Sequence, residues 1–484
     1  MGYNRGFIFS TAVALLTVLV AIYYRRTFAP ENIVQERLRT LIYELEKLEN
    51  SHSITSRLKV AVGYGVCTDV FVKAEHLLKY TEDVGQPEHF KKITTELELL
   101  KNFAYYFRHG AAAERYMPNE TLFNELVAKA RSYPSSYSTI GGNAAIMAMR
   151  FAKEGCDVTL AAKLTKSMYQ MMPQVINIVG GEVKQDDIHL IMEYKRGDVW
   201  GPYSSVRANR YIIHSDTSNP MIRSLDPFDE FLSVTEPNLI VVSGLQMMDN
   251  YPFLEGERQK LLLKVKKQLL ERPLSTKIHF EMASIVENEF FYELIESVLP
   301  YVDSLGVNEQ EIASLKEFVV GGLSNVADSM PNVTVVLDQM RMVFELIRLK
   351  NIVNSSPRKL SRIHVHSLAY QVIFIEKGSE WKNTMAAAAK ASLTAHRHVC
   401  ATNHVDVKKA ALMLDDRFLT SVKDGTEISL DINKPVSCWD EVLSGVIEKI
   451  PIQICVAPGL VCTETAQTAG GGDNISSAGL VLQV

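Results

Sequence analysis

The sequence lacks the signatures of several familiar nucleotide-binding enzymes. No Gly-Lys dipeptide occurs in its 484 residues, which excludes the GxxxxGK(S/T) loop of P-loop kinases, and the HRD and DFG signatures of protein kinases are absent too. An apolar run does enter a glycine turn at Val60–Gly65, but Thr68 stands where the dinucleotide-binding fingerprint needs its third glycine. The chain is therefore not expected to be a P-loop enzyme, a protein kinase or a Rossmann dehydrogenase.

Basic residues are not in excess either. The chain carries 51 Lys plus Arg against 56 Asp plus Glu, a formal net charge of -5 at pH 7, so no nucleic-acid partner is expected. Its six cysteines form no CxxC pair, which argues against a zinc ribbon or a thioredoxin-type site. One or two disulfides would be permitted in an oxidising compartment, but the spacing leaves their pairing open. Small molecules are the expected ligands.

Charge is missing altogether from one N-terminal stretch. The run from Phe7 to Tyr24 is uncharged and lies between Arg5 and the pair Arg25-Arg26. Such a run is typical of secretory targeting, and it is about long enough to cross a bilayer core of roughly 30 Å. No clean small-x-small cleavage site follows it, so a cleaved signal peptide and a retained, membrane-attaching signal anchor both stay open for residues 1–30. The expected location is the endoplasmic reticulum, in its lumen or on its membrane, or outside the cell.

From about Glu31 onward, short apolar runs alternate with longer amphipathic ones, which predicts an α/β layer fold. Two more polar, turn-rich stretches, roughly 80–138 and 180–229, are predicted to be lid insertions over the carboxyl ends of the strands, where open α/β sheets bind ligands. Helices are predicted at Asn143–Glu154 and Arg258–Leu270. The predicted strands are brief, apolar and mostly β-branched, as buried parallel strands are: Lys59–Val62, Asp157–Ala161, Leu239–Ser243, Lys277–Glu281, Val333–Leu337, Arg362–Val365 and Ile452–Val456.

The most informative segment is glycine-rich and runs from Ala469 to Ser477. Gly470, Gly471 and Gly472 leave their backbone N–H groups free to converge on an anion, and the helix that follows adds a favourable dipole for phosphate. Asp473 at the mouth of this loop is placed to accept a proton from an attacking hydroxyl group. The alternative is a glycine-rich turn in which Asp473 only caps the helix.

Two acidic motifs are candidate magnesium sites. His279 and Glu281 share one face of a predicted strand, where they could hold a cation or its water, because Mg²⁺ prefers carboxylate oxygen and often keeps its waters. The alternative is a half-exposed strand with its polar residues outward. Asn308 and Glu311 follow a possible strand at Ser304–Val307 with the spacing of a capping box, so helix stability alone explains them. The functional alternative makes Glu311 a ligand of magnesium-bound water.

Two further segments offer groups that suit a sugar. Gly142 and Asn143 open a predicted helix, where free amides and a short amide side chain could bind hydroxyl groups, although helix capping by Asn143 explains the pattern equally. His189 lies in a short apolar run and is by itself as consistent with a structural histidine.

Taken together and in this order, these segments resemble the animal ADP-dependent glucokinases of the ribokinase superfamily, from about Lys59 to Val484. Four other segments share the resemblance: Gly110–Arg115, Asn209–Tyr211, Ser243–Met248 and Arg362–His366. The resemblance implies a ribokinase-like three-layer α/β/α large domain with a smaller lid domain. It also implies transfer of the terminal phosphoryl group of ADP to the 6-hydroxyl of D-glucose with Mg²⁺, giving glucose 6-phosphate and AMP.

Residue roles follow from the same resemblance. It makes Asp473 the catalytic base and places Glu281, Glu311 and Asp473 around the magnesium ion. The implied sugar contacts are Asp69, Glu114, Gly142, Asn143 and His189. The implied phosphate contacts are Arg207, Arg210 and the glycines Gly470, Gly471 and Gly472.

The glycine loop departs from the family's common Gly-Leu-Gly-Asp-Ala, since Gly471 replaces the leucine and Asn474 the alanine. The extra freedom of glycine costs about 0.5–1 kcal/mol on ordering, which activity should survive. Two alternatives to a glucokinase stay open. One is an ADP-dependent phosphofructokinase, against which Glu114 argues; the other is a non-catalytic sugar or nucleotide sensor, against which the three retained acidic residues argue. We expect a monomer whose partners are glucose and ADP.

Overall fold

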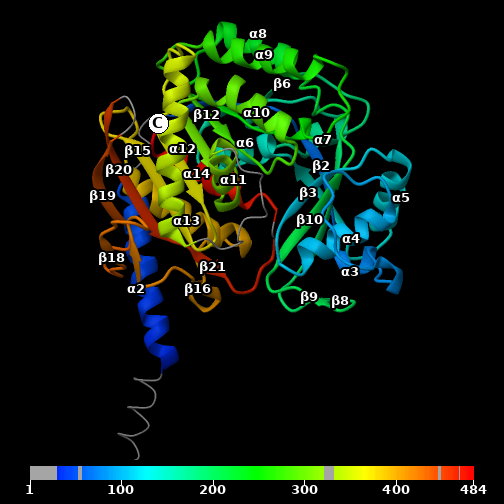
Figure 1. The fold of residues 1–484 in the computed structure, drawn as a ribbon, viewed down its shortest axis with the longest axis horizontal. Helices are drawn as coiled ribbons and strands as arrows, with labels where there is room; N and C mark the ends of the chain where they lie inside the picture. The colour runs from blue at the N-terminus through cyan, green and yellow to red at the C-terminus, as the bar shows by residue number, and fades with distance from the viewer. Residues whose placement is uncertain (1–29, 53–56, 321–331, 445–447, 468) are drawn as a thin grey trace, which may run out of the picture.

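The computed structural model describes residues 30–52, 57–320, 332–444, 448–467 and 469–484 (Figure 1). A ten-stranded sheet forms its body, in the order β19-β20-β15-β14-β13-β12-β11-β1-β5-β6. Its parallel part consists of β14 (Arg362–His366), β13 (Ser304–Val307), β12 (Lys277–Glu281), β11 (Leu239–Val242), β1 (Lys59–Gly63), β5 (Asp157–Ala161) and β6 (Ile176–Val179). One edge continues antiparallel through β15 (Tyr370–Glu376), β20 (Lys449–Pro458) and β19 (Ser437–Ser444).

Helices cover both faces of this sheet, so the predicted three-layer α/β/α domain is confirmed. The central strands are buried on both faces, as all four residues of β11 show. One apolar core lies between the sheet and α8 (Leu225–Val234), α9 (Glu257–Leu270), α10 (Asn288–Ser297), α11 (Glu309–Val320) and α12 (Val333–Val353). The core of the opposite face lies under α2 (Pro30–Asn50), α6 (Asn143–Lys153), α7 (Lys166–Met171), α13 (Thr384–Val399) and α14 (Gly471–Val481).

A second, five-stranded sheet lies beside the large one (Figure 1), in the order β3-β10-β7-β2-β4. Its strands are β2 (Cys67–Lys73), β3 (Ala113–Tyr116), β4 (Tyr137–Gly141), β7 (Ile188–Tyr194) and β10 (Asn209–His214). The helices α3 (Ala74–Leu77), α4 (Glu96–Phe107) and α5 (Glu120–Arg131) cover one of its faces. The predicted insertions, 80–138 and 180–229, contain β3, β7 and β10, whereas β2 lies before both of them.

Three small antiparallel pairs complete the strands: β8 (Val199–Trp200) with β9 (Tyr203–Ser204), β16 (Ala410–Leu412) with β21 (Leu460–Cys462), and β17 (Arg417–Leu419) with β18 (Glu427–Ser429). Disulfides join Cys400 to Cys462 and Cys438 to Cys455, while Cys67 and Cys156 are free and buried. No helix within the described ranges is both long and apolar enough to cross a membrane. The apolar run from Phe7 to Tyr24 lies outside those ranges.

The prediction of a strand at Val333–Leu337 is wrong, whereas the other six strands and both helices are found. Of those six, Ile452–Val456 lies in β20, which is antiparallel to both of its neighbours and not parallel as expected. The run Val333–Leu337 is the start of α12, and the side chain of Asn332 caps the N-terminus of the helix. The β-branched cluster imitates a strand locally, but its apolar residues continue at helical spacing through Val336, Met340 and Phe344, all of them buried. Burial of that long stripe outweighs the local β-propensity.

Candidate active site

Asp473 lies in the first turn of α14, at the end of the glycine-rich loop. Gly470 is the N-cap of this helix with a left-handed backbone (φ 68°), and no side chain caps it. The carboxylate of Asp473 instead accepts a hydrogen bond of 2.9 Å from Nδ2 of Asn143, which Gln246 holds in turn. Asp473 therefore does not serve as the helix cap, and the starts of α6 and α14 meet at its carboxylate.

The surroundings of Asp473 suit a base that works near neutral pH. Its side chain is buried with 7% of its surface exposed. Burial and the nearby charge of Glu281 raise the pKa of Asp473 to about 7, against the opposing effects of Asn143, His366 and Arg210. A carboxylate with a pKa close to ambient pH both exists in its basic form and holds a transferred proton.

Glu281 is the centre of a buried hydrogen-bond cluster. Its two carboxylate oxygens contact Nε2 of His366 at 2.8 Å, Nε2 of His279 at 2.8 Å and the hydroxyl of Ser476 at 2.6 Å. Burial alone would raise the pKa of Glu281, but hydrogen bonds from the two histidines hold it well below its usual range. Glu281 is thus ionised and is joined to α14 through Ser476, three residues after Asp473. The alternative of an outward-facing polar strand is wrong, because His279 and Glu281 are buried.

Glu311 makes the capping box that the spacing indicated. Its Oε2 accepts from the backbone N–H of Asn308 at 2.8 Å, while Asn308 Oδ1 accepts from the N–H of Glu311 at 2.9 Å. Burial raises the pKa of Glu311 to about 8, and the charge of His366 opposes this rise. Glu311 can therefore cap α11 and also lie near His366, because α11 begins at the edge of the sheet where the parallel strands end.

The predicted sugar contacts from the smaller domain share the face of the five-stranded sheet that its helices leave free. Alternation along the strands puts Val70, Leu190 and Ile213 into the core under those helices and their neighbours on the other face. Asp69 pairs with His189 across β2 and β7, and Glu114 Oε1 lies 3.5 Å from His189 Nδ1. Gly142, with φ of 87°, turns the chain from this sheet into α6.

His189 is held by a buried acidic partner that the sequence did not indicate. Its Nε2 lies 3.1 Å from Asp216, which Asn219 also contacts at 2.8 Å. Burial alone would lower the pKa of His189, but the charges and hydrogen bond of Asp216, with Glu114 and Asp69, raise it to about 10. Burial raises the pKa of Asp69 to about 6. The predicted sugar-facing groups thus form one charged cluster.

The two predicted phosphate contacts of the smaller domain are Arg207, just before β10, and Arg210, within β10. The charge of Arg210 is among the influences that lower the pKa of Asp473 and of Asp69, so its guanidinium lies within electrostatic reach of both carboxyls. Arg207 acts in the same way on Glu309 at the start of α11. Both cations are therefore close enough to influence the charge of carboxyl groups at the starts of α14 and α11.

Glycine is needed at one position of the loop and not at another. A Cβ at Gly472 would lie 2.6 Å from Cε1 of His366, so the absence of a side chain lets this histidine approach the loop. A Cβ at Gly471 would meet only His398, at 3.9 Å. The departure of Gly471 from the family pattern is thus a matter of backbone freedom and not of steric exclusion.

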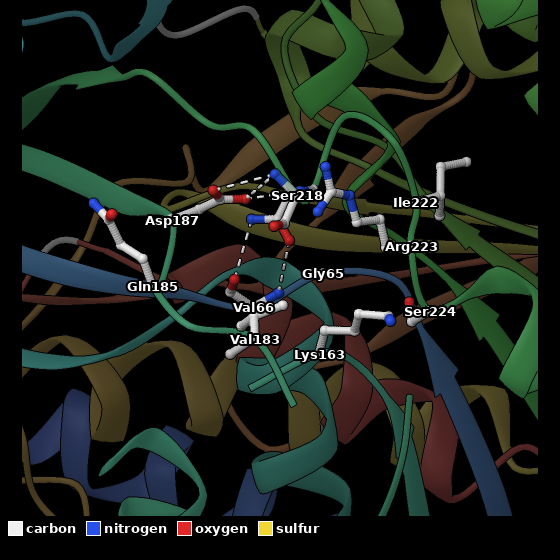
Figure 2. Close-up of a pocket in the computed structure, with 11 residues that line it drawn as sticks. Gly65, Val66, Lys163, Val183, Gln185, Asp187, Ser218, Ile222, Arg223 and Ser224 are labelled. Atoms are coloured by element: carbon white, nitrogen blue, oxygen red, sulfur yellow. Dashed lines mark hydrogen bonds between the residues drawn. The ribbon is translucent and has the colours of Figure 1, made fainter. Parts of the chain in front are cut away.

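A pocket lies where the chain crosses between the two sheets (Figure 2). The carboxylate of Asp187 accepts hydrogen bonds from the backbone N–H groups of Thr217, Ser218 and Asn219, and Asn219 also bonds the backbone of Val66. This loop holds Asp216 against His189. The pocket is lined by Lys163 and by residues of the three segments in which the chain passes between the sheets. These residues are Gly65, Val66, Val183, Gln185, Asp187, Ser218, Asn219, Ile222, Arg223 and Ser224.

Sequence reasoning missed the roles of His366, Ser476 and Gln246. Arg362, His364 and His366 alternate with apolar residues on β14, so three polar side chains share one face of a fully buried strand. That alternation was a usable signal, because buried polar side chains need partners. Ser476 gave none, since a serine one helical turn past Asp473 resembles any other helical serine.

The three-layer α/β/α architecture, with a buried carboxylate in the first turn of the helix that follows Gly470, agrees with the ribokinase-like fold expected from the sequence. A family model described as "ADP-specific Phosphofructokinase/Glucokinase conserved region" matches residues 58–482. The chain belongs to this family.

Relatives support the same assignment. An ADP-dependent glucokinase of Bos taurus is 30% identical over 429 residues, which covers 87% of this chain and 84% of the relative. A probable ADP-dependent glucokinase of Caenorhabditis elegans is 28% identical over 439 residues, with the same coverage. Among solved structures, an ADP-dependent kinase in complex with fructose-6-phosphate and ADPbetaS has a TM-score of 0.64 at 16% identity, covering 93% of this chain and 97% of its own. The last similarity concerns the fold alone.

The ion pair of His189 with Asp216 predicts how the free energy of unfolding changes with pH. The folded pKa of His189, about 10, lies above its ordinary value of 6.5, so the pair stabilises the fold fully below pH 6.5 and loses this effect as pH rises towards 10. The difference in unfolding free energy between wild type and His189→Gln should therefore shrink by an amount on the order of a few kcal/mol from pH 6.5 to 9.5. Urea unfolding at a series of pH values measures it; a constant difference would contradict the assignment.

Proposed function

We propose that this protein is an ADP-dependent glucokinase, which transfers the terminal phosphoryl group of ADP to the 6-hydroxyl of D-glucose. The observation that carries the proposal is the hydrogen bond of Asn143 to the buried carboxylate of Asp473 at the start of α14. It joins a predicted sugar contact to the predicted base. The names of the animal relatives support the same substrates.

In the proposed reaction the glucose oxygen attacks the terminal phosphorus of ADP and AMP leaves with the bridging oxygen. Asp473 accepts the hydroxyl proton, for which a pKa of about 7 is well matched. The backbone N–H groups of Gly471 and Gly472 and the dipole of α14 stabilise the charge on the transferred group. Arg210 adds a positive charge from the smaller domain, and positioning accounts for much of the rate.

The acidic residues fit a magnesium ion that is held through its waters. Glu281 is ionised. Its Oε1 accepts one hydrogen bond, from His366, and keeps a lone pair for a water of the ion, whereas its Oε2 already accepts from His279 and Ser476. The oxygens of Glu311 are likewise engaged by Asn308, so water-mediated contact suits both residues better than direct ligation. When bound with the nucleotide, Mg²⁺ would neutralise charge on the phosphate oxygens.

Glucose is favoured over fructose 6-phosphate by the charge of the predicted sugar face. Asp69, Glu114 and Asp216 all act on His189 there. A phosphorylated sugar would bring two further negative charges to these carboxylates, which costs binding energy, whereas neutral hydroxyl groups can donate hydrogen bonds to them.

A coupled assay tests the proposal. Purified protein should form glucose 6-phosphate from glucose, ADP and Mg²⁺, with far lower rates for fructose 6-phosphate or ATP, and excess EDTA should abolish turnover until Mg²⁺ is restored. Preference for fructose 6-phosphate would support the phosphofructokinase alternative. Tight glucose binding by calorimetry without turnover would support the non-catalytic sensor instead.

We also propose that the protein acts as a monomer in the endoplasmic reticulum or outside the cell. Two disulfides suit an oxidising compartment, which supports the location. The N-terminal residue of the mature protein, read by mass spectrometry from its native source, would separate a cleaved signal peptide from a retained anchor. A protein recovered from the cytosol with all cysteines reduced would contradict the location.

A further inference from the structure

A cysteine that the kinase reaction does not use lies in the charged cluster of the smaller domain. Cys67 stands two residues before Asp69 on β2, so both side chains leave the same face of the sheet. Its Sγ lies 3.2 Å from Oδ1 of Asp69, and Asp69 is the strand neighbour of His189. The three side chains are buried, and one ligand atom from each lies within 4.8 Å of the others.

The same spacing is found in a second, overlapping group. His189, His214 and Asp216 also offer ligand atoms that lie within 4.8 Å of one another. His214 follows His189 in the next strand, because β10 pairs with β7 at this point. A metal ion near His189 would thus meet further nitrogen and oxygen donors without a change in the register of the sheet.

The charge of the cluster favours a cation. Three carboxyl groups, of Asp69, Glu114 and Asp216, act on His189. The cationic side chain that acts on Asp69 from outside the cluster is that of Arg210. A divalent ion would interact with these carboxylates, which lie around His189 in surroundings from which water is largely excluded.

The donor atoms decide which cation fits. A thiolate, an imidazole and a carboxylate are each ligand types that Zn²⁺ accepts, in a tetrahedral arrangement that leaves a fourth position for water. Mg²⁺ needs an octahedron of oxygens and has no use for the sulfur of Cys67. One nitrogen of His189 lies beside Glu114 and the other beside Asp216. The ion would take one of these nitrogens, and the carboxylate beside the other would orient the ring as an outer partner.

We propose that Cys67, Asp69 and His189 form a binding site for a thiophilic divalent cation, with Zn²⁺ as its natural occupant. On binding, the S–H bond of Cys67 breaks and its proton passes to solvent as the bond between sulfur and the ion forms, while His189 ligates through a neutral nitrogen. Because Asp69 and His189 are also the proposed sugar contacts, Zn²⁺ and glucose exclude each other. This second statement rests on the proposed function, whereas the metal site does not.

The two free cysteines provide a matched experiment on the full chain. Titration with Co²⁺ or Cd²⁺ should produce thiolate-to-metal absorption at one ion per chain in wild type and in Cys156→Ser, and none in Cys67→Ser. Cys156 is the control because it is also buried and unpaired but lies away from the cluster, before β5. Absorption that survives Cys67→Ser, or that is lost in Cys156→Ser, overturns the proposal.

X-ray absorption at the zinc edge of the wild-type complex makes the test independent of any variant. One sulfur ligand together with nitrogen and oxygen ligands is expected, and a shell without sulfur overturns the proposal. Saturating glucose should then lower the apparent Zn²⁺ affinity at least tenfold. If the sulfur-ligated complex forms and glucose leaves it unchanged, the metal site stands and the placing of the sugar on Asp69 and His189 is wrong.

Discussion

Asp473→Asn should lower kcat by about 10²–10⁴-fold while the protein stays folded. Asparagine keeps the shape of the side chain and can still accept the hydrogen bond from Asn143, but it cannot take up the hydroxyl proton. Because the base acts in the transition state, kcat and kcat/KM should fall together with little change in KM for glucose. Steady-state kinetics in the coupled assay measures this, with the exposed Asp226→Asn as a control expected to match wild type.

The stability of the same variant separates chemistry from folding. The folded pKa of Asp473, about 7, lies above its ordinary value of 3.8, so the folded state holds this proton more tightly and loses stability as pH rises between the two values. Asparagine removes that loss, and the variant should be at least as stable as wild type at pH 7.5. Near-normal turnover in a well-folded Asp473→Asn protein would rule out the proposed base.

Glu281→Gln should destabilise the protein by about 3–5 kcal/mol as well as abolish most of its turnover. The carboxylate balances His366, whose pKa its hydrogen bond and charge raise to about 9 although burial alone would lower it. A neutral amide leaves that cation buried without its ionised partner, and its single oxygen cannot accept all the hydrogen bonds that the two carboxylate oxygens accept from His366, His279 and Ser476. The low pKa of Glu281 means that wild type keeps this stabilisation throughout the neutral range, since it is lost only as pH falls through the folded value.

Glu311→Gln is the matched control for this second result. Burial raises the pKa of Glu311 to about 8, so its side chain is mostly neutral at pH 7 and an amide resembles it in charge and shape. We expect a loss of less than about 1 kcal/mol from the weakened capping box. Urea unfolding of both variants gives the comparison. Equal losses would show that the cluster around Glu281 is held by packing and not by its ionised carboxylate.

Much of the site could be predicted because its residues stand in short local motifs. The loop at Gly470–Asp473 and the spacing of Asn308 and Glu311 are readable from the chain alone, as is the shared face of His279 and Glu281. The partners of these residues were not readable. Asn143 is 330 positions from Asp473, and His366 is 85 positions from Glu281, so no local pattern relates them.

The amino-acid pattern by itself indicated most strands of the large sheet, the glycine-rich start of α14 and the carboxylates that we propose take part in the reaction. These are short-range properties, set by apolar runs, glycine and the period of a strand or helix. Only the tertiary structure decided that α12 is a helix, that Asp216 lies against His189, and that burial brings the pKa of Asp473 to about 7. Each of these depends on which residues from distant parts of the chain pack around the position. Burial of a helix and desolvation of a carboxyl group are set by the whole core and not by residues adjacent in the sequence.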